Sequence, residues 1–353
     1  MYFRQFLNDE SGCCSYFIAS RASNEAIVVD PEIDIAQYTA LAAERGYAIK
    51  YVADTHVHAD HISGARTLAA VTGAELCMHE ACEARYEYRK LTDGEEIHLG
   101  PLVLRIMHTP GHRPESISIL VINPARSAEP CMVLTGDSLF VGDVGRPDFG
   151  GAEGVLEQYR SIQKLLELED YVEVFPAHFE GSCGKEMSGH PTTTIGFERR
   201  FNPLLTMGER EFTEVVSEPM ARPLNMNAIV ETNLGIADNS SASPTGGPPA
   251  HSVSADAAPE WIREHDPLLL DVRELWEYEA GHLPGAVSLP QAEIAERLSE
   301  IPMDRELMTI CRSGARSVRT ARFLKKAGRE RVVSLALGTE GWIEAGNPVE
   351  KAG

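Results

Sequence analysis

The first two thirds of the chain alternate short apolar runs with segments whose apolar residues recur at helical spacing. The apolar runs predict buried strands, and those at 116–122 and 131–137 are predicted to be neighbours. Apolar residues recur every three or four positions over 155–168, which predicts a helix, and a second helix over 35–46 is predicted to end at a glycine. This alternation favours a layered α/β domain. The remaining strands are predicted at 26–30, 51–55 and 171–178.

The last third of the chain repeats the alternation on a smaller scale. It predicts strands at 268–273, 308–311 and 332–337, with a helix at 318–328 between the last two strands. Between the two parts, residues 237–258 are rich in Ser, Ala, Pro and Gly and have almost no large apolar side chains, which is typical of a linker. We therefore predict a domain at 1–235, a linker at 236–257 and a second α/β domain at 258–353.

The charge balance excludes several classes of partner. The 353 residues have a formal net charge of −21, with −17 before residue 255 and −4 after it. Nucleic acid and anionic membrane surfaces favour clustered Lys and Arg, so neither is expected as the main partner. No apolar run approaches the roughly 18 residues of a membrane span. The first residues also lack an apolar signal core, so we expect neither secretion nor organelle import.

The seven cysteines form a poor disulfide framework. Their number is odd, their spacing is irregular and no CxxC pair occurs. This pattern favours reduced thiols, and we therefore predict a cytoplasmic location.

Four ligand-type side chains directly follow the predicted strand at 51–55. They are His56, His58, Asp60 and His61. Because alternate residues of an extended chain point the same way, the first two can approach one site. Further candidates stand at the ends of later predicted strands, namely His112, Asp137 and His178. This cluster predicts a metal site, whereas isolated histidines such as His79, His98, His190 and His251 are expected to be structural.

The run HxHxDH, followed by PGH, GD and AH, resembles the metallo-β-lactamase superfamily. The resemblance covers about residues 1–235 and implies an αββα sandwich with the metal site at one edge. It implies one site at His56, His58 and His112, with Asp137 between this site and the other. The second site would contain Asp60, His61 and His178. The ligands alone leave two chemistries open, a two-metal thioesterase of the glyoxalase II type and a one-iron persulfide dioxygenase.

The segment Gly145-Arg146-Pro147-Asp148-Phe149 resembles the GRxDF segment of persulfide dioxygenases. That resemblance implies one Fe(II) per chain, held by His56, His112 and Asp137. Two histidines and one carboxylate leave three coordination positions open, as non-haem Fe(II) oxygenases need for O2 and substrate. The remaining ligand-type residues would then orient the ligands or form a vacant second site; they are His58, Asp60, His61 and His178.

Two further features, Arg146 and Cys183, leave alternatives open. Arg146 is predicted either to bind a carboxylate of the substrate or to pair with Asp148. Cys183 lies between glycines in a segment that resembles bacterial metallo-β-lactamase–rhodanese fusions, and it is either a sulfur-handling thiol or a small turn residue. Cys13 and Cys14 precede an apolar strand-like run and are expected to be core residues.

A second candidate site is the loop Cys311-Arg312-Ser313-Gly314-Ala315-Arg316 between a predicted strand and a helix. Backbone N–H groups and the positive helix end favour negative charge on the sulfur and a bound anion. The loop is one residue shorter than that of cysteine phosphatases, which suits a persulfide or thiosulfate. Together with DVR at 271–273, GHLPGA at 281–286 and Gly341-Trp342, it resembles rhodanese domains. The resemblance implies sulfur transfer at Cys311, stabilised by Arg312 and Arg316, with Asp271 paired to a loop arginine and Trp342 packed in the core.

The two resemblances together predict an α/β fusion enzyme with two reactions. In the first, O2 oxidises glutathione persulfide to sulfite and glutathione in an Fe(II)-dependent reaction. In the second, sulfur moves between thiosulfate and glutathione through a Cys311 persulfide, in either direction. The alternatives are a dinuclear-zinc glutathione thioester hydrolase fused to a rhodanese, and a non-enzymatic sulfur carrier. Related dioxygenases also suggest self-association.

Overall fold

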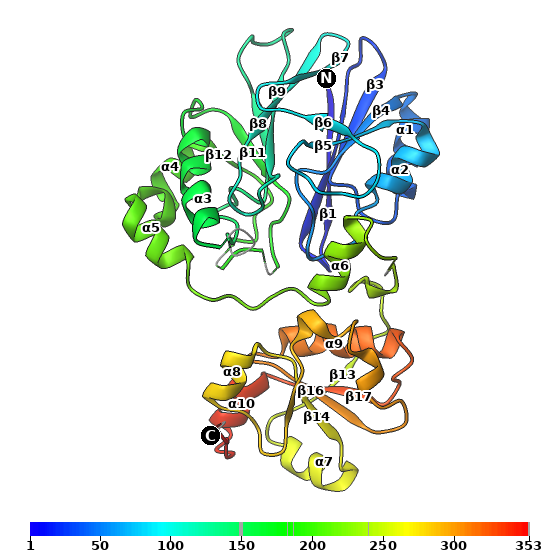
Figure 1. The fold of residues 1–353 in the computed structure, drawn as a ribbon, viewed down its shortest axis with the longest axis vertical. Helices are drawn as coiled ribbons and strands as arrows, with labels where there is room; N and C mark the ends of the chain where they lie inside the picture. The colour runs from blue at the N-terminus through cyan, green and yellow to red at the C-terminus, as the bar shows by residue number, and fades with distance from the viewer. Residues whose placement is uncertain (148–150, 182, 186, 239, 352–353) are drawn as a thin grey trace. The chain divides into compact units, whose positions relative to one another are not determined.

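The computed structural model describes residues 1–147, 151–181, 183–185, 187–238 and 240–351 (Figure 1). The chain divides into two compact units. The first contains Met1–His58, Ile62–Met220 and Asn233–Ile236, and the second contains Ala59–His61, Ala221–Thr232 and Ala237–Gly353. None of the helices in these described ranges is long and apolar enough to cross a membrane.

The first unit begins with a six-stranded sheet in the order β1-β2-β3-β4-β5-β6. Its strands are β1 (Tyr2–Asn8), β2 (Cys13–Ala19), β3 (Glu25–Val29), β4 (Ala48–Ala53), β5 (Glu75–His79) and β6 (Arg89–Leu91). The first three strands pair antiparallel and the last four pair parallel. The connecting helices are α1 (Ala36–Arg45) and α2 (Ala65–Thr72). Both end at a left-handed glycine, Gly46 and Gly73, as expected for a helix stop.

A second six-stranded sheet has the order β12-β11-β10-β9-β8-β7. Its strands are β7 (Glu96–Leu99), β8 (Leu102–His108), β9 (Ile117–Ile122), β10 (Met132–Gly136), β11 (Glu173–Pro176) and β12 (Thr193–Thr194). The helical segments that follow are α3 (Gly151–Leu165), α4 (Ile195–Phe201), η1 (Pro203–Thr206) and α5 (Glu209–Val216). The predicted neighbours at 116–122 and 131–137 are confirmed as the antiparallel pair β9 and β10.

Three apolar clusters show how the layers of this unit pack. One cluster joins the facing sides of the two sheets and includes Tyr16, Ile18, Leu104 and Ile119. A second lies between the first sheet and its helices α1 and α2. The third lies between the second sheet and helices α3 and α5. The order helix, sheet, sheet, helix confirms the predicted αββα sandwich.

The second unit is built on a parallel five-stranded sheet in the order β13-β17-β16-β14-β15 (Figure 1). Its strands are β13 (His251–Val253), β14 (Leu268–Asp271), β15 (Val287–Ser288), β16 (Leu307–Ile310) and β17 (Val332–Leu335). Its helices are α6 (Met226–Asn233), α7 (Ala258–His265), α8 (Leu275–Ala280), α9 (Ala315–Lys326) and α10 (Gly338–Glu344), with short 3-10 turns η2 (Ser240–Ala242), η3 (Gln291–Glu293) and η4 (Leu298–Glu300). Two apolar clusters pack on this sheet and confirm an α/β domain.

One segment differs from its expected form. Residues 237–258 were expected to be a linker, yet β13 lies within them and pairs with β17 at the sheet edge. An edge strand is held through main-chain hydrogen bonds, so it does not need the large side chains whose absence suggested a linker. The segment before it, Ala221–Thr232, also belongs to this unit, where Leu224 is part of the core.

Candidate metal centre and cysteine loop

The ends of strands from both sheets meet at the candidate metal centre. His56 follows β4, Asp137 follows β10 and His178 follows β11. Backbone hydrogen bonds hold these ends together, with Ile117 N–H donating to the Thr55 carbonyl at 2.9 Å and Ala177 N–H donating to the Gly136 carbonyl at 2.9 Å. His112 lies in the loop between β8 and β9. The sheet pairing therefore brings together side chains that are far apart in sequence.

Three predicted ligands form one compact group. The donor atoms of His56, His112 and Asp137 all lie within 4.8 Å of one another, and the three residues are buried. The two Nε2 atoms lie 3.6 and 3.5 Å from Asp137 Oδ2. Within the described part of the chain, that carboxylate oxygen has no hydrogen-bond donor. A buried carboxylate oxygen without a donor, facing two imidazole nitrogens, fits a divalent cation.

The other ring nitrogen of each histidine is held by a hydrogen bond. His112 Nδ1–H donates to the Arg146 carbonyl at 2.7 Å. Thr55 Oγ1 donates to Asp30 Oδ2 at 2.9 Å, so it accepts from His56 Nδ1–H, also at 2.9 Å. These bonds leave both Nε2 lone pairs directed to the cation site, which is the usual support of a metal-binding histidine.

Burial and neighbouring groups lower the pKa values of two members of this group, His56 and Asp137. Burial, reinforced by His58, holds the pKa of His56 well below its usual value, so the ring is neutral and can act as a ligand. Burial alone would raise the pKa of Asp137, but His178 and His56 outweigh it, and the pKa lies well below the usual range. Asp137 is thus a carboxylate and His56 a neutral imidazole, the protonation states that metal binding requires.

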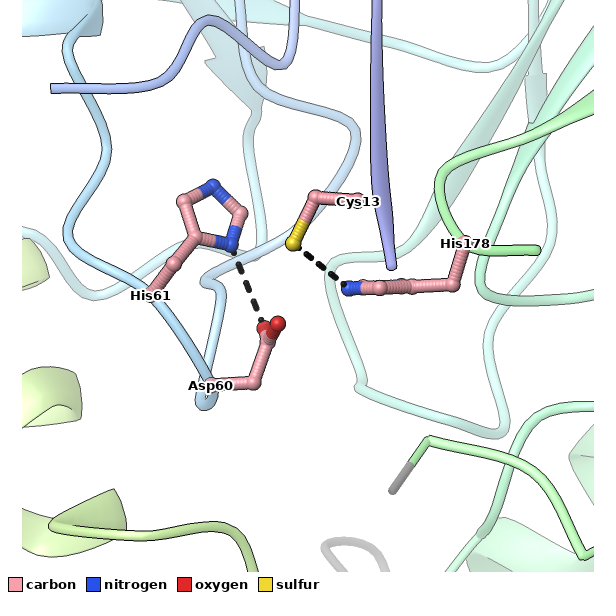
Figure 2. A group of neighbouring side chains, drawn as sticks. All are labelled: Cys13, Asp60, His61 and His178. Carbon is pink, nitrogen blue, oxygen red and sulfur yellow. Dashed lines mark hydrogen bonds and ion pairs between the residues drawn. The ribbon is translucent and has the colours of Figure 1, made fainter. Parts of the chain in front are cut away.

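A second group of ligand-type side chains, drawn in Figure 2, adjoins the first through His178. It contains Cys13, Asp60, His61 and His178, whose donor atoms again lie within 4.8 Å of one another. Cys13 Sγ lies 3.4 Å from His178 Nε2, and His61 Nδ1 lies 3.3 Å from Asp60 Oδ1. His178 Nδ1–H donates to Asp137 Oδ1 at 2.7 Å, which connects the two groups.

Cys13 is buried as predicted, but its place beside His178 was not anticipated. An antiparallel bridge pairs Cys13 with His178, and Cys14 N–H donates to the Ala177 carbonyl at 2.7 Å. These contacts join residues about 165 positions apart. Periodicity within one strand carries no information on such a contact.

His58 lies beside His56, with ring centroids 4.3 Å apart, and is close to two carboxylates. Its Nε2–H donates to Asp30 Oδ1 at 3.1 Å and lies 3.9 Å from Asp54 Oδ1. These three residues form a separate buried group. Asp30 therefore supports His58 directly and His56 through Thr55.

The GRPDF segment contributes backbone as well as side chains. A Cβ on Gly145 would lie only 1.7 Å from the Asp137 carbonyl oxygen, so only glycine fits at this close approach. The side chain of Arg146 is 2% exposed and donates from Nη2 to the Met220 carbonyl at 3.2 Å. Its own carbonyl braces His112. These contacts favour a bracing role for Arg146, whereas Asp148 and Phe149 lie outside the described residues.

Cys183 is also buried near the centre. Its sulfur lies within 4.8 Å of ligand atoms of both Asp137 and His178, and its carbonyl accepts from Arg146 N–H at 3.0 Å. The position accommodates both of the alternatives stated for this residue.

Two positioning residues were not found from the sequence. Gln158 on α3 accepts from His112 N–H at 2.9 Å and donates to the Ser138 carbonyl at 2.7 Å. Asn233 donates to the His58 carbonyl at 2.9 Å and accepts from Ser63 N–H at 3.0 Å. The only available signal for Gln158 is a polar residue beside the apolar stripe of the helix, and Asn233 lies about 175 positions from its partner.

Gln158→Leu is expected to weaken the metal centre. The leucine is of similar size, but His112 N–H loses its acceptor and the Ser138 carbonyl loses the nearer of its two donors. We expect a loss of about 2 kcal/mol in stability and at least about 10-fold in metal affinity. A competitive metal titration checks this, with Arg160→Leu on the exposed face of α3 as the control. Equal affinity of both variants and the parent protein would contradict the assigned role.

The cysteine loop lies between β16 and α9, as predicted. Cys311 is 1% exposed, and its sulfur accepts from Gly314 N–H at 3.1 Å. Gly314 is the N-cap of α9 in a left-handed conformation, with φ 98°. The sulfur therefore lies at a helix N-terminus with an N–H group directed to it, an environment that favours negative charge.

The two loop arginines have different surroundings. Arg316 forms a two-pronged pair with Glu277 on α8, at 2.7 and 2.5 Å, which fixes the loop. Arg312 is exposed and donates to Glu340 at 2.7 Å. Asp271 was expected to pair with a loop arginine, but this is wrong, because it pairs with Arg273 at 2.7 Å. Arg273 is only two residues from Asp271 in the sequence, so its side chain reaches the carboxylate locally.

Glu277→Gln is expected to loosen the loop and remove an acid-sensitive contribution to stability. Burial would raise the pKa of Glu277, but Arg316 outweighs it and the net pKa is lowered. The contribution is therefore complete above the unfolded pKa of about 4.3 and is lost as the pH falls through the lower folded pKa.

We expect the glutamine variant to lose about 2 kcal/mol at pH 7 and progressively less below about pH 4. Denaturant unfolding can be followed by tryptophan fluorescence, because all three tryptophans, Trp261, Trp276 and Trp342, lie in the second unit. Glu279→Gln on the same helix is the control. A loss independent of pH would count against the pair.

Two family models match the chain. The metallo-beta-lactamase superfamily matches residues 9–178, and the rhodanese-like domain matches residues 254–345. The first match contains every residue of both ligand groups, and the second contains the cysteine loop.

Relatives of known name match about two thirds of the chain. The chain is 30% identical over 237 residues to persulfide dioxygenase ETHE1, mitochondrial, of Bos taurus, covering 65% of this chain and 87% of the bovine protein. The human protein of that name is 29% identical over 236 residues, with coverages of 65% and 87%.

Two solved structures are similar at the level of the fold and sequence. A metallo-beta-lactamase from Staphylococcus aureus subsp. aureus COL has a TM-score of 0.64 and 27% identity, covering 96% of this chain and 98% of its own. ETHE1 from Myxococcus xanthus has a TM-score of 0.59 and 30% identity, covering 67% and 99%. The first similarity extends over both units, and the second over about two thirds of the chain.

Proposed function

Because the chain belongs to the metallo-β-lactamase superfamily, with persulfide dioxygenase homologues, and has a C-terminal rhodanese domain, we propose that it oxidises glutathione persulfide and transfers sulfur. The first unit converts glutathione persulfide, O2 and water to glutathione and sulfite, using one Fe(II). The second moves sulfur between thiosulfate and glutathione through a Cys311 persulfide. The observation that carries the oxygenase proposal is the buried group of two imidazoles and one carboxylate oxygen without a donor.

The residues of the first unit would hold iron and organise its surroundings. His56, His112 and Asp137 would be the ligands, and Fe(II) would supply the activation of O2 and the binding of the persulfide sulfur. His178 keeps Asp137 Oδ1 hydrogen-bonded, so Oδ2 is directed to the cation site. Arg146 and Thr55 hold the two histidine rings at the correct tautomer.

A specific observation also favours the alternative function. The group of Cys13, Asp60, His61 and His178 has enough donors for a second cation. Two zinc ions would suit a dinuclear glutathione thioester hydrolase rather than a dioxygenase. An oxygenase leaves this second group without a metal, and its residues then act on Asp137 through His178.

The second unit transfers sulfane sulfur and needs no external oxidant or reductant. The Cys311 thiolate attacks the outer sulfur of thiosulfate, the S–S bond of thiosulfate breaks, and sulfite leaves. A thiolate then attacks the outer sulfur of the Cys311 persulfide and leaves as a persulfide. Arg316 fixes the loop through Glu277, and Gly314 N–H stabilises the sulfur at Cys311. The reverse sequence would consume glutathione persulfide and sulfite.

Several further properties are part of this proposal. The substrates and products, glutathione persulfide, glutathione, thiosulfate and O2, rest on the family resemblance, as does self-association. A cytoplasmic location is supported by the seven free cysteines. The acidic balance of the first unit still speaks against nucleic acid or anionic membrane as a partner.

Reconstitution of the metal-free protein separates the two functions. Aliquots loaded with Fe(II) or with Zn(II) are given glutathione persulfide in an oxygen electrode and, separately, a glutathione thioester. We expect O2 uptake only in the Fe(II) sample and no thioester hydrolysis above background. Thioester hydrolysis by the zinc sample without O2 uptake by the iron sample would sink the dioxygenase proposal.

A further inference from the structure

Leu337 adopts a backbone conformation that leucine rarely accepts. Its φ is 58°, in the left-handed region. The other non-glycine residues of the described chain with positive φ are Asn24, Asp30, Asn225 and Asp266, whose side chains tolerate this region. The Leu337 side chain is 63% exposed, so its burial does not offset the strain. A strained and exposed apolar residue indicates a role other than packing.

The turn that contains Leu337 is pressed against the cysteine loop. Leu337 follows β17, and the next residue, Gly338, also has a positive φ of 55°. A Cβ on Gly338 would lie 2.1 Å from the Cys311 carbonyl oxygen, so the approach leaves no room for a side chain. Thr339 N–H donates to that carbonyl at 2.8 Å, and Glu340 N–H donates to the Arg312 carbonyl at 3.1 Å.

Leu337 itself lies against the residue that contacts the sulfur. A Cβ on Gly314 would lie 3.0 Å from Leu337 N, and Gly314 N–H donates to Cys311 Sγ. Only Gly314 thus lies between the backbone of Leu337 and Cys311 Sγ, while the Leu337 side chain is exposed to solvent. Cys311 is itself almost completely buried. The exposed Leu337 side chain therefore lies beside a loop whose reactive residue is covered.

The chemistry of the surrounding groups suggests which substrate needs the leucine. Arg312 and Glu340, an exposed ion pair, provide charge beside the loop. A small inorganic ion can be bound by the N–H groups and the nearby charges alone when it reacts at the sulfur. An organic thiol also brings a carbon skeleton that extends beyond the loop, and apolar surface at the rim stabilises it by removing it from water.

We propose that Leu337 is a specificity-determining residue that contacts the carbon skeleton of the organic thiol in sulfur transfer at Cys311. This inference rests on the proposed sulfur transfer. In the step concerned, a thiolate RS⁻ attacks the outer sulfur of the Cys311 persulfide. The S–S bond to Cys311 breaks, a new S–S bond forms in RSS⁻, and the Cys311 thiolate is the leaving group. The backbone strain keeps the leucine in place at the rim.

The test compares two acceptors with thiosulfate as the common donor. Glutathione is the organic acceptor and cyanide is the small inorganic one. Leu337→Gly removes the side chain at a φ that glycine prefers, so the fold and its thermal midpoint are expected to be retained. Leu337→Asn tolerates the same φ but is polar. We expect kcat/KM for glutathione to fall about 5- to 20-fold in both variants, mainly through KM. Values for cyanide should stay within about 2-fold.

Ile343→Ala is the matched control, at an exposed apolar position of α10, the helix that begins directly after Leu337. It should change kcat/KM for neither acceptor. Equal losses for glutathione and cyanide, or no loss for either, would overturn the role of Leu337. Failure of the proposed function would look different, because the parent protein would then transfer no sulfur from thiosulfate to either acceptor.

Discussion

Asp137→Asn is expected to abolish metal binding at the centre and O2 uptake with glutathione persulfide. The amide has no negative charge to hold a divalent cation between His56 and His112, and it also disturbs the acceptor of His178 Nδ1–H. Replacing a residue that only supports a ligand costs about 10- to 100-fold in metal affinity, so replacing the carboxylate ligand should cost more than about 100-fold. Metal content and O2 uptake of the purified variant check this.

Two companion variants sharpen the result. Asp93→Asn removes an exposed carboxylate of the same unit and should leave metal content unchanged. Asp60→Asn removes a member of the second group and should retain iron at the first group, whereas a two-zinc enzyme would lose one metal. Sulfur transfer should survive in all three variants, since it depends on Cys311. Undiminished iron binding by Asp137→Asn would contradict the assigned ligand set.

Cys311→Ser should eliminate sulfur transfer from thiosulfate while leaving O2 uptake intact. A serine hydroxyl cannot carry sulfane sulfur as a persulfide, and loss of a covalent nucleophile typically costs at least about 1,000-fold. The assay measures sulfite released from thiosulfate in the presence of glutathione.

The matched control is Cys131→Ser, which replaces a half-buried free cysteine of the first unit. It should change neither reaction. Residual transfer above about 1% in the Cys311 variant would show that another thiol carries the sulfur.

The pattern of the chain was sufficient for much of the fold. Buried strands and amphipathic helices have periodicities that are local, so β3, β4, β9, β10 and β11 were predicted close to their observed bounds. The edge strand β13 was not, because its pairing with β17 uses backbone groups that all sequences share.

The candidate site divides in a similar way. Ligands are chemically distinctive and stand at strand ends, so His56, His112 and Asp137 could be proposed from residue type and motif. The residues that hold them could not, because Gln158 and Asn233 are ordinary polar residues whose partners are distant in sequence. The predicted partner of Asp271 was wrong because Arg273, two residues away, pairs with it, and residue type alone does not distinguish Arg273 from the loop arginines.

The measurement that tests the central claim most directly is the metal content and O2 uptake of a single purified sample. We predict about one iron per chain and uptake of about one O2 for each glutathione persulfide consumed. About two zinc ions per chain, with no persulfide-dependent uptake of O2 after iron loading, would contradict the account.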